Sequence, residues 1–358
     1  MAAQTINGIT LNYPNDPCTV FNPCVFRLTG TTLARSRVTI TSGGKTYTAT
    51  YQTPKGGALD LRQFLQVLFD GLTLGADLEQ ITDSQVSELG KSVTITIEAL
   101  AADNTVIATF SRNIFCIWGA TKSGEDFERI TGITTRHITW FTAFPLTVGL
   151  YINLPSRITL YAYTARPDDG GQIKNINFAN KGLYNVVIDD DGGANRNYIG
   201  IDNTDTLATN FIIKIDREHN EGIYLRWIDR HGFWCYWLFK AGDPTRTAAS
   251  KFGTWYRNNL ANYDQFIGWY DGAGRRQSYT RNDVQPICAP LVDSETFDYL
   301  QDITTSPVVD MFLGYDDNDR PMWVTVTVEP GQYTKNVDKP EQDFICNILL
   351  PEIPTQTL

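Results

Sequence analysis

The chain is organised by short runs in which apolar and polar residues alternate, the pattern of strands that have one covered face and one wet face. Residues 37–41 and 46–51 alternate in this way on either side of a Gly-Gly pair, which is typical of a tight primed turn. Residues 92–99 and 105–110 repeat the arrangement around a polar turn. These runs predict two β-hairpins in the first third of the chain.

One segment, residues 60–70, replaces the alternation with a helical period. Its apolar residues recur at spacings of three and four, which puts them on one face of a helix. They are Leu61, Phe64, Leu65, Leu68 and Phe69. Asp60 can cap the first turn and Gly71 can end the helix. We predict one short amphipathic helix that packs on the N-terminal sheets, with packing on a neighbouring subunit as the alternative.

The most aromatic stretch, residues 222–239, consists of two apolar runs joined at Arg230-His231-Gly232, which predicts a hairpin with a three-residue turn and an exposed His231. Large side chains occupy both alternating sets of positions, so both faces of this strand pair need cover. A neighbouring copy of the chain can supply that cover. We therefore predict a self-association or ligand surface on this hairpin and on two later tryptophans: Tyr224, Arg226, Trp227, Trp234, Tyr236, Trp237, Trp255 and Trp269.

The division into domains is predicted from the turn-rich sequence at residues 166–171, which interrupts the apolar runs. The fold class is mostly β, with two or three β-sandwich-like domains and one short helix. The first domain, residues 1–165, is a β-sandwich that carries the helix. The second, residues 166–358, is β-rich and built around the hairpin at 222–239. A last hairpin is predicted over residues 308–328.

Composition and charge narrow the class of partner. A chain of 358 residues with 42% hydrophobic positions can bury two or three cores. The 30 basic and 40 acidic residues give a net charge of −10, which argues against nucleic acid and against an anionic membrane as partners. No run reaches the ~20 apolar residues of a membrane-spanning helix. The first residues show no secretory signal pattern, so we expect folding in a cytoplasm.

Candidate chemistry is sparse. Cys18 and Cys24 are close in sequence, but six cysteines without a CxxC pair, and three scattered histidines, predict reduced and buried thiols instead of a metal site. The acidic runs 189–191 and 316–319 offer oxygens that suit calcium, yet they lack the glutamate of an EF-hand and fit ordinary turns. The sequence contains no nucleophile-elbow, zinc-protease or phosphate-loop motif. We predict no catalytic residue, no metal and no cofactor.

The hairpin at 222–239 resembles a pattern in virion proteins of bacteriophages that infect gut Bacteroidetes, and residues 116–120, 124–127 and 139–145 are similar to the same group. The resemblance implies a non-enzymatic structural protein that is located in the virion after assembly in the host cytoplasm. A helix-bearing β-sandwich followed by a second one looks like the layout of distal tail and baseplate-hub proteins. Those proteins form rings, usually hexameric, so the resemblance implies a homo-oligomer that contacts other virion proteins and binds no cofactor.

Two other functions fit the sequence. A carbohydrate-binding adhesin module would stack sugars of a host surface glycan on exposed aromatic rings. The rings available for that purpose are Trp234, Tyr236, Trp255, Tyr256, Trp269 and Tyr270. A β-sandwich glycosidase would need a pair of carboxylates, and forty acidic residues do not single one out. Self-assembly in a phage tail or tail tip is the function that we expect.

Overall fold

The computed structural model describes residues 2–75, 78, 83–122, 136–165, 169–203, 211–255, 275–351, 354 and 355. Its fold is mostly β, as predicted, and the strands form several sheets. The predictions that concern residues 124–127, Tyr256, Trp269 and Tyr270 lie outside the described residues.

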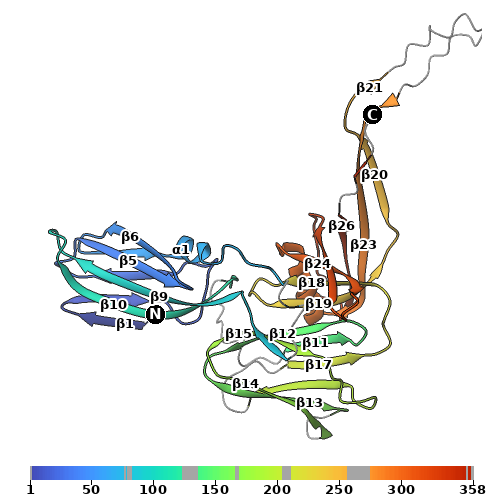
Figure 1. The fold of residues 1–358 in the computed structure, drawn as a ribbon, viewed down its shortest axis with the longest axis horizontal. Coiled ribbons are helices and arrows are strands. Elements are labelled where there is room, and N and C mark those ends of the chain that lie inside the picture. The colour runs from blue at the N-terminus through green and yellow to red at the C-terminus, as the bar shows by residue number, and fades with distance from the viewer. Residues whose placement is uncertain are drawn as a thin grey trace, which may run out of the picture.

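The N-terminal unit is a sandwich of two sheets (Figure 1). The first has the order β1-β2-β4-β7, with strands β1 (Ala2–Ile6), β2 (Ile9–Tyr13), β4 (Val25–Thr29) and β7 (Gly56–Asp60). The second has the order β3-β10-β9-β5-β6, with strands β3 (Cys18–Thr19), β5 (Arg35–Ser42), β6 (Lys45–Gln52), β9 (Gly90–Leu100) and β10 (Val106–Ile117). Apolar side chains of both sheets, among them Phe26 and Phe110, share one core.

Both hairpins predicted for this unit are present. Ser42 pairs with Lys45 across Gly43 and Gly44, and both glycines have positive φ, as a primed turn requires. The predicted helix is α1 (Arg62–Val67), which is shorter than residues 60–70. Leu61 holds the N-cap position, but Asp60, which ends β7, caps the first turn as predicted by accepting a hydrogen bond from the Arg62 backbone N–H at 3.0 Å.

The middle unit combines the sheet β11-β17-β16-β13-β14 with the sheet β12-β15-β8. The larger sheet consists of β11 (Arg136–Phe141), β13 (Ser156–Tyr163), β14 (Gly171–Phe178), β16 (Tyr198–Asn203) and β17 (Phe211–Asp216). The smaller consists of β8 (Ser84–Val86), β12 (Leu146–Ile152) and β15 (Gly182–Ile188). The strand β8 comes from the part of the chain between α1 and β9, so the N-terminal segment contributes to the middle unit.

The domain boundary predicted near residue 165 falls inside this unit and is wrong. The strands β13 and β14 lie on either side of it and pair from Ser156 with Phe178 to Ala162 with Gly171. A turn-rich sequence marks a hairpin loop as readily as a linker between domains. The change from the N-terminal core to the next core occurs instead at the end of β10, where Ile114 and Cys116 belong to the first core and Phe115 and Ile117 to the second.

The C-terminal unit is a sheet with the order β19-β18-β24-β25-β26-β23-β20, in which an additional pairing of β19 with β23 closes six strands into a barrel. Its strands are β18 (Ile223–Ile228), β19 (Trp234–Ala241), β20 (Thr245–Ser250), β23 (Tyr279–Asp293), β24 (Val309–Tyr315), β25 (Pro321–Val328) and β26 (Glu341–Leu349). The hairpins predicted at 222–239 and 308–328 are β18–β19 and β24–β25, so both predictions are confirmed.

A second helix, α3 (Ser294–Gln301), continues into the short 3-10 helix η4 (Asp302–Thr305) and packs on the barrel. The predicted N-terminal helix is present, and this second helix in the C-terminal unit is an addition to the prediction. Asp293 caps α3 by accepting a hydrogen bond from the Thr296 backbone N–H at 2.7 Å. Phe297 and Leu300 bury one side of the helix in the barrel core.

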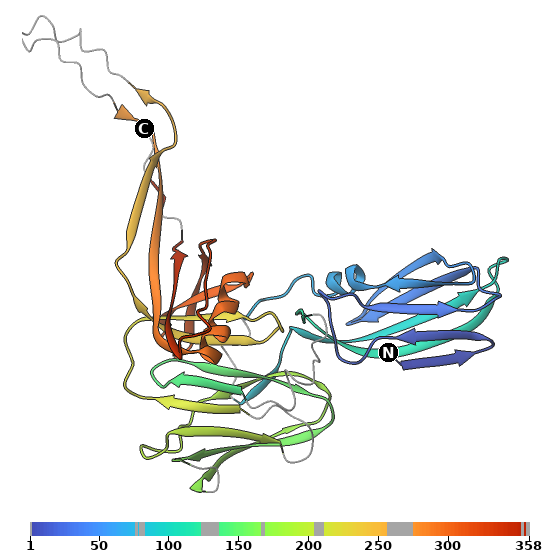
Figure 2. The same ribbon diagram turned by 180° about the vertical axis from the view of Figure 1, so that it is seen from behind.

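A ribbon projects from the barrel, as Figures 1 and 2 show. It consists of β20 and the outer half of β23, which pair from Thr245 with Val284 to Ser250 with Tyr279, and it leads to β21 (Thr254–Trp255) and β22 (Arg275–Arg276). We call residues 244–255 and 275–284 the arm. All six residues of β20 are exposed, and β20 is the last strand of its sheet.

The described residues form three hydrophobic cores, centred on the N-terminal sandwich, the middle unit and the barrel. The middle core reaches into the barrel strands, so the second and third units share a wall. Within the described part of the chain, the helices are too short and too polar to cross a membrane.

Candidate functional site

The predicted association surface lies in the interior. Five of its eight side chains are each at most 5% exposed in the isolated chain: Tyr224, Arg226, Trp227, Trp234 and Tyr236. For these five residues the prediction of a self-association or ligand surface is wrong. Trp237 is half-buried. The side chain of Trp255 and all of Trp269 lie outside the part of the chain that the structure describes.

The hairpin β18–β19 is buried because it forms the wall between two cores. Tyr224 and Tyr236 belong to the core of the middle unit, whereas Leu225 and Trp227 belong to the core of the barrel. Half-buried Trp237 packs against both cores. The alternation that puts large side chains on both faces is therefore satisfied within one chain. The pattern predicts two covered faces correctly, but the cover is intramolecular.

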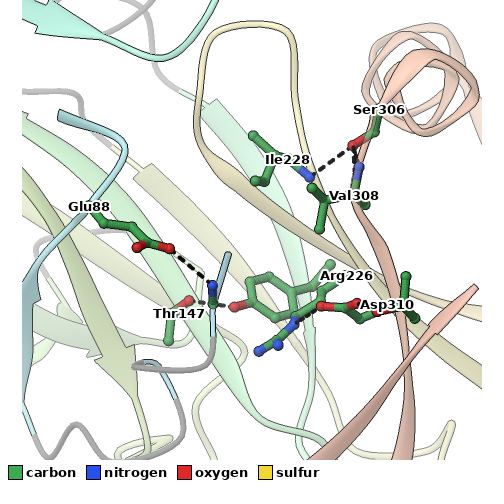
Figure 3. Close-up of polar contacts among 10 residues, drawn as sticks. Glu88, Thr147, Arg226, Ile228, Ser306, Val308 and Asp310 are labelled. Atoms are coloured by element: carbon green, nitrogen blue, oxygen red, sulfur yellow. Dashed lines mark hydrogen bonds and ion pairs between the residues drawn. The ribbon is translucent and has the colours of Figure 1, made fainter. Parts of the chain in front are cut away.

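A buried ion pair joins Arg226 of β18 to Asp310, its cross-strand neighbour on β24 (Figure 3). Arg226 Nε donates to Asp310 Oδ2 at 3.0 Å, and neither side chain is more than 8% exposed. The guanidinium carbon of Arg226 lies 4.2 Å from the ring centre of Trp323 and 5.0 Å from that of Trp234. Both rings stabilise the cation, and removal of either charged partner would leave the other charge buried and uncompensated.

All three units meet beside this ion pair. The Tyr236 hydroxyl lies 2.6 Å from Thr147 Oγ1 on β12. Gly75 of the N-terminal segment approaches Trp234 so closely that a Cβ there would lie 2.7 Å from the ring. Glu88 fixes this loop by accepting a hydrogen bond from the Gly75 backbone N–H at 3.3 Å (Figure 3). These buried and paired groups join the three units at one point, which we call the junction.

The turn of the hairpin docks on the end of β10. A Cβ on Gly119 would lie 2.5 Å from the carbonyl carbon of His231, and one on Gly232 would lie 2.6 Å from the Trp118 carbonyl oxygen. Gly232 also has a φ of +86°, which favours glycine. The close approach brings residues 117–120 into direct contact with the hairpin.

This contact buries His231, which is 5% exposed, so the prediction of an exposed turn histidine is wrong. The Asp229 carboxylate accepts hydrogen bonds from the backbone N–H groups of His231 at 3.0 Å and Phe233 at 2.8 Å, and it lies 3.6 Å from Arg136. Burial acts to raise the pKa of Asp229, but His231 and Arg136 outweigh it and the pKa is lowered. Burial, followed by the charge of Asp229, raises the pKa of Asp302 to about 6.

A cleft of about 660 Å³ opens between the middle unit and the barrel. The strands β11 and β17 form one side, and β19, β23 and α3 form the other. Trp237 contributes to its wall, with a ring centre 5.4 Å from that of Phe141. The volume suits a small ligand or an inserted side chain. The charged lining residues other than histidine are Lys214, Asp216, Glu221, Lys240, Asp293 and Glu341.

Two histidine–carboxylate pairs lie at this cleft. His137 Nδ1 is 3.3 Å from Glu295 Oε2, and both side chains are exposed. His219 Nδ1 is 2.9 Å from Asp216 Oδ2. Burial acts to raise the pKa of Asp216, but the hydrogen bonds from His219 and Glu218 lower it overall. Sequence reasoning missed this cleft, because its walls come from strands that are far apart in the chain.

Three cysteines meet in the N-terminal unit. Cys18 Sγ lies 3.6 Å from Cys116 Sγ and 3.8 Å from Cys24 Sγ. The contact with Cys116 and burial raise the pKa of Cys18, and the contact with Cys18 and burial raise that of Cys24, which favours protonated thiols. All six cysteines are free in this structure, and the predicted burial is seen for Cys24, Cys116, Cys235 and Cys346. Among the described residues, no group of three or more histidine, cysteine or acidic side chains can hold a metal ion.

The acidic runs serve as turns. Asp190 and Asp191 accept hydrogen bonds from the backbone N–H groups of Gly192 and Gly193 at 2.8 and 2.9 Å. Asp316 accepts two such bonds, both at 2.8 Å, one of them from Arg320. These contacts agree with the turn interpretation of both runs.

Comparison with known proteins identifies no family: no family model and no curated protein matches the chain. The solved structures that match include a bacterial ice-binding adhesin, with 9% identity over 88% of this chain and 95% of that chain and a TM-score of 0.17. An α2-macroglobulin from Escherichia coli matches with 8% identity over 96% of this chain and 24% of that chain, and the TM-score is 0.18. A Ca²⁺-stabilised adhesin of an Antarctic bacterium matches with 12% identity over 88% of this chain and 72% of that chain, and the TM-score is 0.16. Similarity at this level carries no argument about function.

Proposed function

We propose that the chain is a non-enzymatic structural protein of a bacteriophage virion, in the tail or tail tip, and that its copies associate into a ring. The burial of the aromatic hairpin removes the original physical reason for self-association. The support now comes from the resemblance to virion proteins and from the arm.

The arm is the observation that carries the proposal. A two-stranded ribbon on its own is marginally stable in water, and every residue of β20 is exposed. The outer edge of β20 pairs with no other described strand, which leaves backbone donors and acceptors available. A long open edge of this kind is a template for pairing with another chain, and an assembly of copies would cover it.

The segments that carry the resemblance also form one joint. Phe144 stacks on Tyr224 with ring centres 4.5 Å apart, and the Tyr224 hydroxyl donates to the Pro145 carbonyl at 2.8 Å. Residues 117–120 of the segment 116–120 contact the turn of the same hairpin. A pattern whose described parts converge on a packed joint is expected of a scaffold that must keep its units in fixed positions.

The test is the assembly state of the purified full chain, measured by native mass spectrometry and electron microscopy over a range of concentrations. We expect a closed oligomer of defined stoichiometry. A strict monomer at every concentration and ionic strength would overturn the proposal.

Carbohydrate binding is a second candidate, and the cleft is the observation that favours it. Trp234 and Tyr236 are buried and cannot stack a sugar, but half-buried Trp237 lines the cleft beside polar side chains. Binding of glycans from an array, lost in Trp237→Ala and kept in the exposed control Lys339→Ala, would favour this function. Absence of binding by the wild-type chain would exclude it for the glycans tested.

A further inference from the structure

The arm carries an excess of positive charge in an acidic protein. The stretch 244–284 contains six basic and three acidic residues, although the whole chain has a net charge of −10. Arg246 and Arg281 both pair with Asp283, with Nε–Oδ1 distances of 2.9 Å. Lys251 and Arg276 lie farther out and are exposed, and neither pairs with a carboxylate among the described residues. The outer part of the arm therefore presents cations without a described counter-charge.

The cleft between the middle unit and the barrel has the opposite charge balance, because acidic side chains outnumber basic ones there. Four carboxylates line it against two lysines. Two of these carboxylates, Glu221 and Glu341, are exposed and form no ion pair within the part of the chain that the structure describes. A cation brought to this cleft would find two solvent-facing carboxylates available.

Each surface also exposes a large apolar side chain. Leu291, at the cleft, is 69% exposed and has a φ of +49°, an unusual conformation for a bulky residue. It lies in the irregular stretch where the pairing of β23 with β26 shifts register. Phe252, on the arm, is 53% exposed. Contact between the two surfaces could remove both side chains from water.

We infer that the arm of one copy docks at the cleft of a second copy, where Lys251 and Arg276 face the carboxylates of Glu221 and Glu341. The inference rests on the proposed self-assembly and names the two surfaces that would carry it. Exposed ion pairs supply register and specificity in such a contact, while apolar contact and strand-edge pairing supply affinity.

The geometry favours an intermolecular contact. Residues 245–255 span about 35 Å at ~3.3 Å per residue, and the arm points away from the middle unit that forms one side of the cleft (Figure 2). The arm and the cleft are different surfaces, so their contact is head-to-tail. Repetition of a head-to-tail contact closes into a ring when the rotation per copy allows it.

A basic ribbon also suits nucleic acid, which is the competing partner. The net charge of −10 would repel a phosphate backbone over most of the molecule, whereas the acidic cleft is a complementary surface carried by every copy. These charges favour a second copy of the chain.

The test is a charge swap in the full chain. One variant reverses the arm (Lys251→Glu with Arg276→Glu), and another reverses the cleft (Glu221→Lys with Glu341→Lys). The control for the arm variant, Lys45→Glu with Lys339→Glu, makes the same change of net charge at exposed sites on the body. Association is measured by analytical ultracentrifugation, and circular dichroism confirms folding. If a reversed arm fails to fold, the neutral pair Lys251→Gln and Arg276→Gln replaces it.

We expect each reversal to weaken association by about tenfold or more, because two attractive pairs become repulsive, and the control to leave it unchanged. An equimolar mixture of the two reversed variants should regain association, since each arm then meets a cleft of opposite charge. Unchanged assembly in both variants, or no recovery on mixing, would overturn the docking inference and leave the proposed function intact. Binding of a 30-base-pair DNA duplex that is lost in the arm variant, with assembly unchanged, would assign the arm to nucleic acid instead. A wild-type chain that never associates would overturn both proposals.

Discussion

Two consecutive two-stranded ribbons of this chain differ in burial: one is enclosed by the fold and the other is exposed to solvent. The hairpin β18–β19 carries large aromatic side chains and is buried on both faces, whereas the arm starts three residues after β19 and exposes all of β20. The first is covered by the middle unit and the barrel core, so it needs no partner. In the arm, β20 consists of small and polar residues and keeps an open hydrogen-bonding edge. Aromatic abundance therefore marks a core in this chain, and we propose that the open edge of β20 is a surface for association.

The largest effect is expected from removing the carboxylate on β24 that pairs with Arg226 of the buried hairpin. Asp310→Ala leaves Arg226 buried without its carboxylate, so we expect a loss of about 3–5 kcal/mol in the free energy of unfolding. Urea unfolding followed by tryptophan fluorescence measures it. Arg226→Met combined with Asp310→Leu removes both charges and should cost less than the single change. A loss below about 1 kcal/mol in Asp310→Ala would show that the ion pair is not shielded from water as its burial implies.

The joint between the hairpin turn and β10 gives the next largest effect. A Cβ on Gly119 would lie 2.5 Å from the His231 carbonyl carbon, so Gly119→Ala must push the turn away. We expect a loss of about 1–3 kcal/mol, as for other overpacked sites. Thermal unfolding measures the change, and Gly253→Ala, which has open space around its Cβ, is the matched control. Equal stability of the two variants would contradict the tight docking of the turn.

Asp302 gives a smaller effect that depends on pH. Its folded pKa is raised from 3.8 to about 6, so the folded state holds the proton more tightly than the unfolded state. Stability contributed by this group therefore falls as pH rises from about 4 to about 6, and the penalty is complete above that range. Asp302→Asn should gain about 1–2 kcal/mol at pH 8 and almost nothing at pH 4. A gain of the same size at both pH values would rule out this titration as the cause.

The smallest effects are expected in the arm. Thr247→Ala and Ala249→Ser lie on β20, where no side chain is buried, so each should change the free energy of unfolding by less than about 0.5 kcal/mol. Urea unfolding of the dilute protein, under conditions in which copies stay apart, isolates this effect. A loss above about 1.5 kcal/mol would mean that the arm packs within its own chain, and the contrast between the two ribbons would fail.

Local pattern was enough to predict the hairpins, because turn residues and alternation act between neighbours in sequence. The glycines at 43 and 44, the helix near residue 62 and the strand pair at 222–239 are examples. The second helix was missed, although Asp293 at its N-cap and the spacing of Phe297 and Leu300 were visible signals.

Long-range pairing could not be predicted from the same pattern. Nothing near Cys18 or Cys24 in sequence indicates that Cys116 is their neighbour, and nothing near residue 222 says which segments cover the hairpin. The cleft could not be predicted from the sequence for the same reason, because only the fold brings Glu221 and Glu341 to one cleft. The alternation pattern indicates how many faces of a strand are buried, but only the tertiary fold determines which segments bury them.

The short strand β8 has a consequence for biosynthesis. Its partner β15 begins at Gly182, about a hundred residues after Ser84–Val86, so at ~5–20 residues per second the ribosome makes β8 roughly 5–20 s before it can pair. During that interval the nascent N-terminal sandwich can form while one of its connecting segments waits, unpaired, for a sheet that has not yet been translated. Folding of the first two units is thereby coupled in time, and a ribosome stalled between residues 120 and 180 would hold a half-finished middle unit.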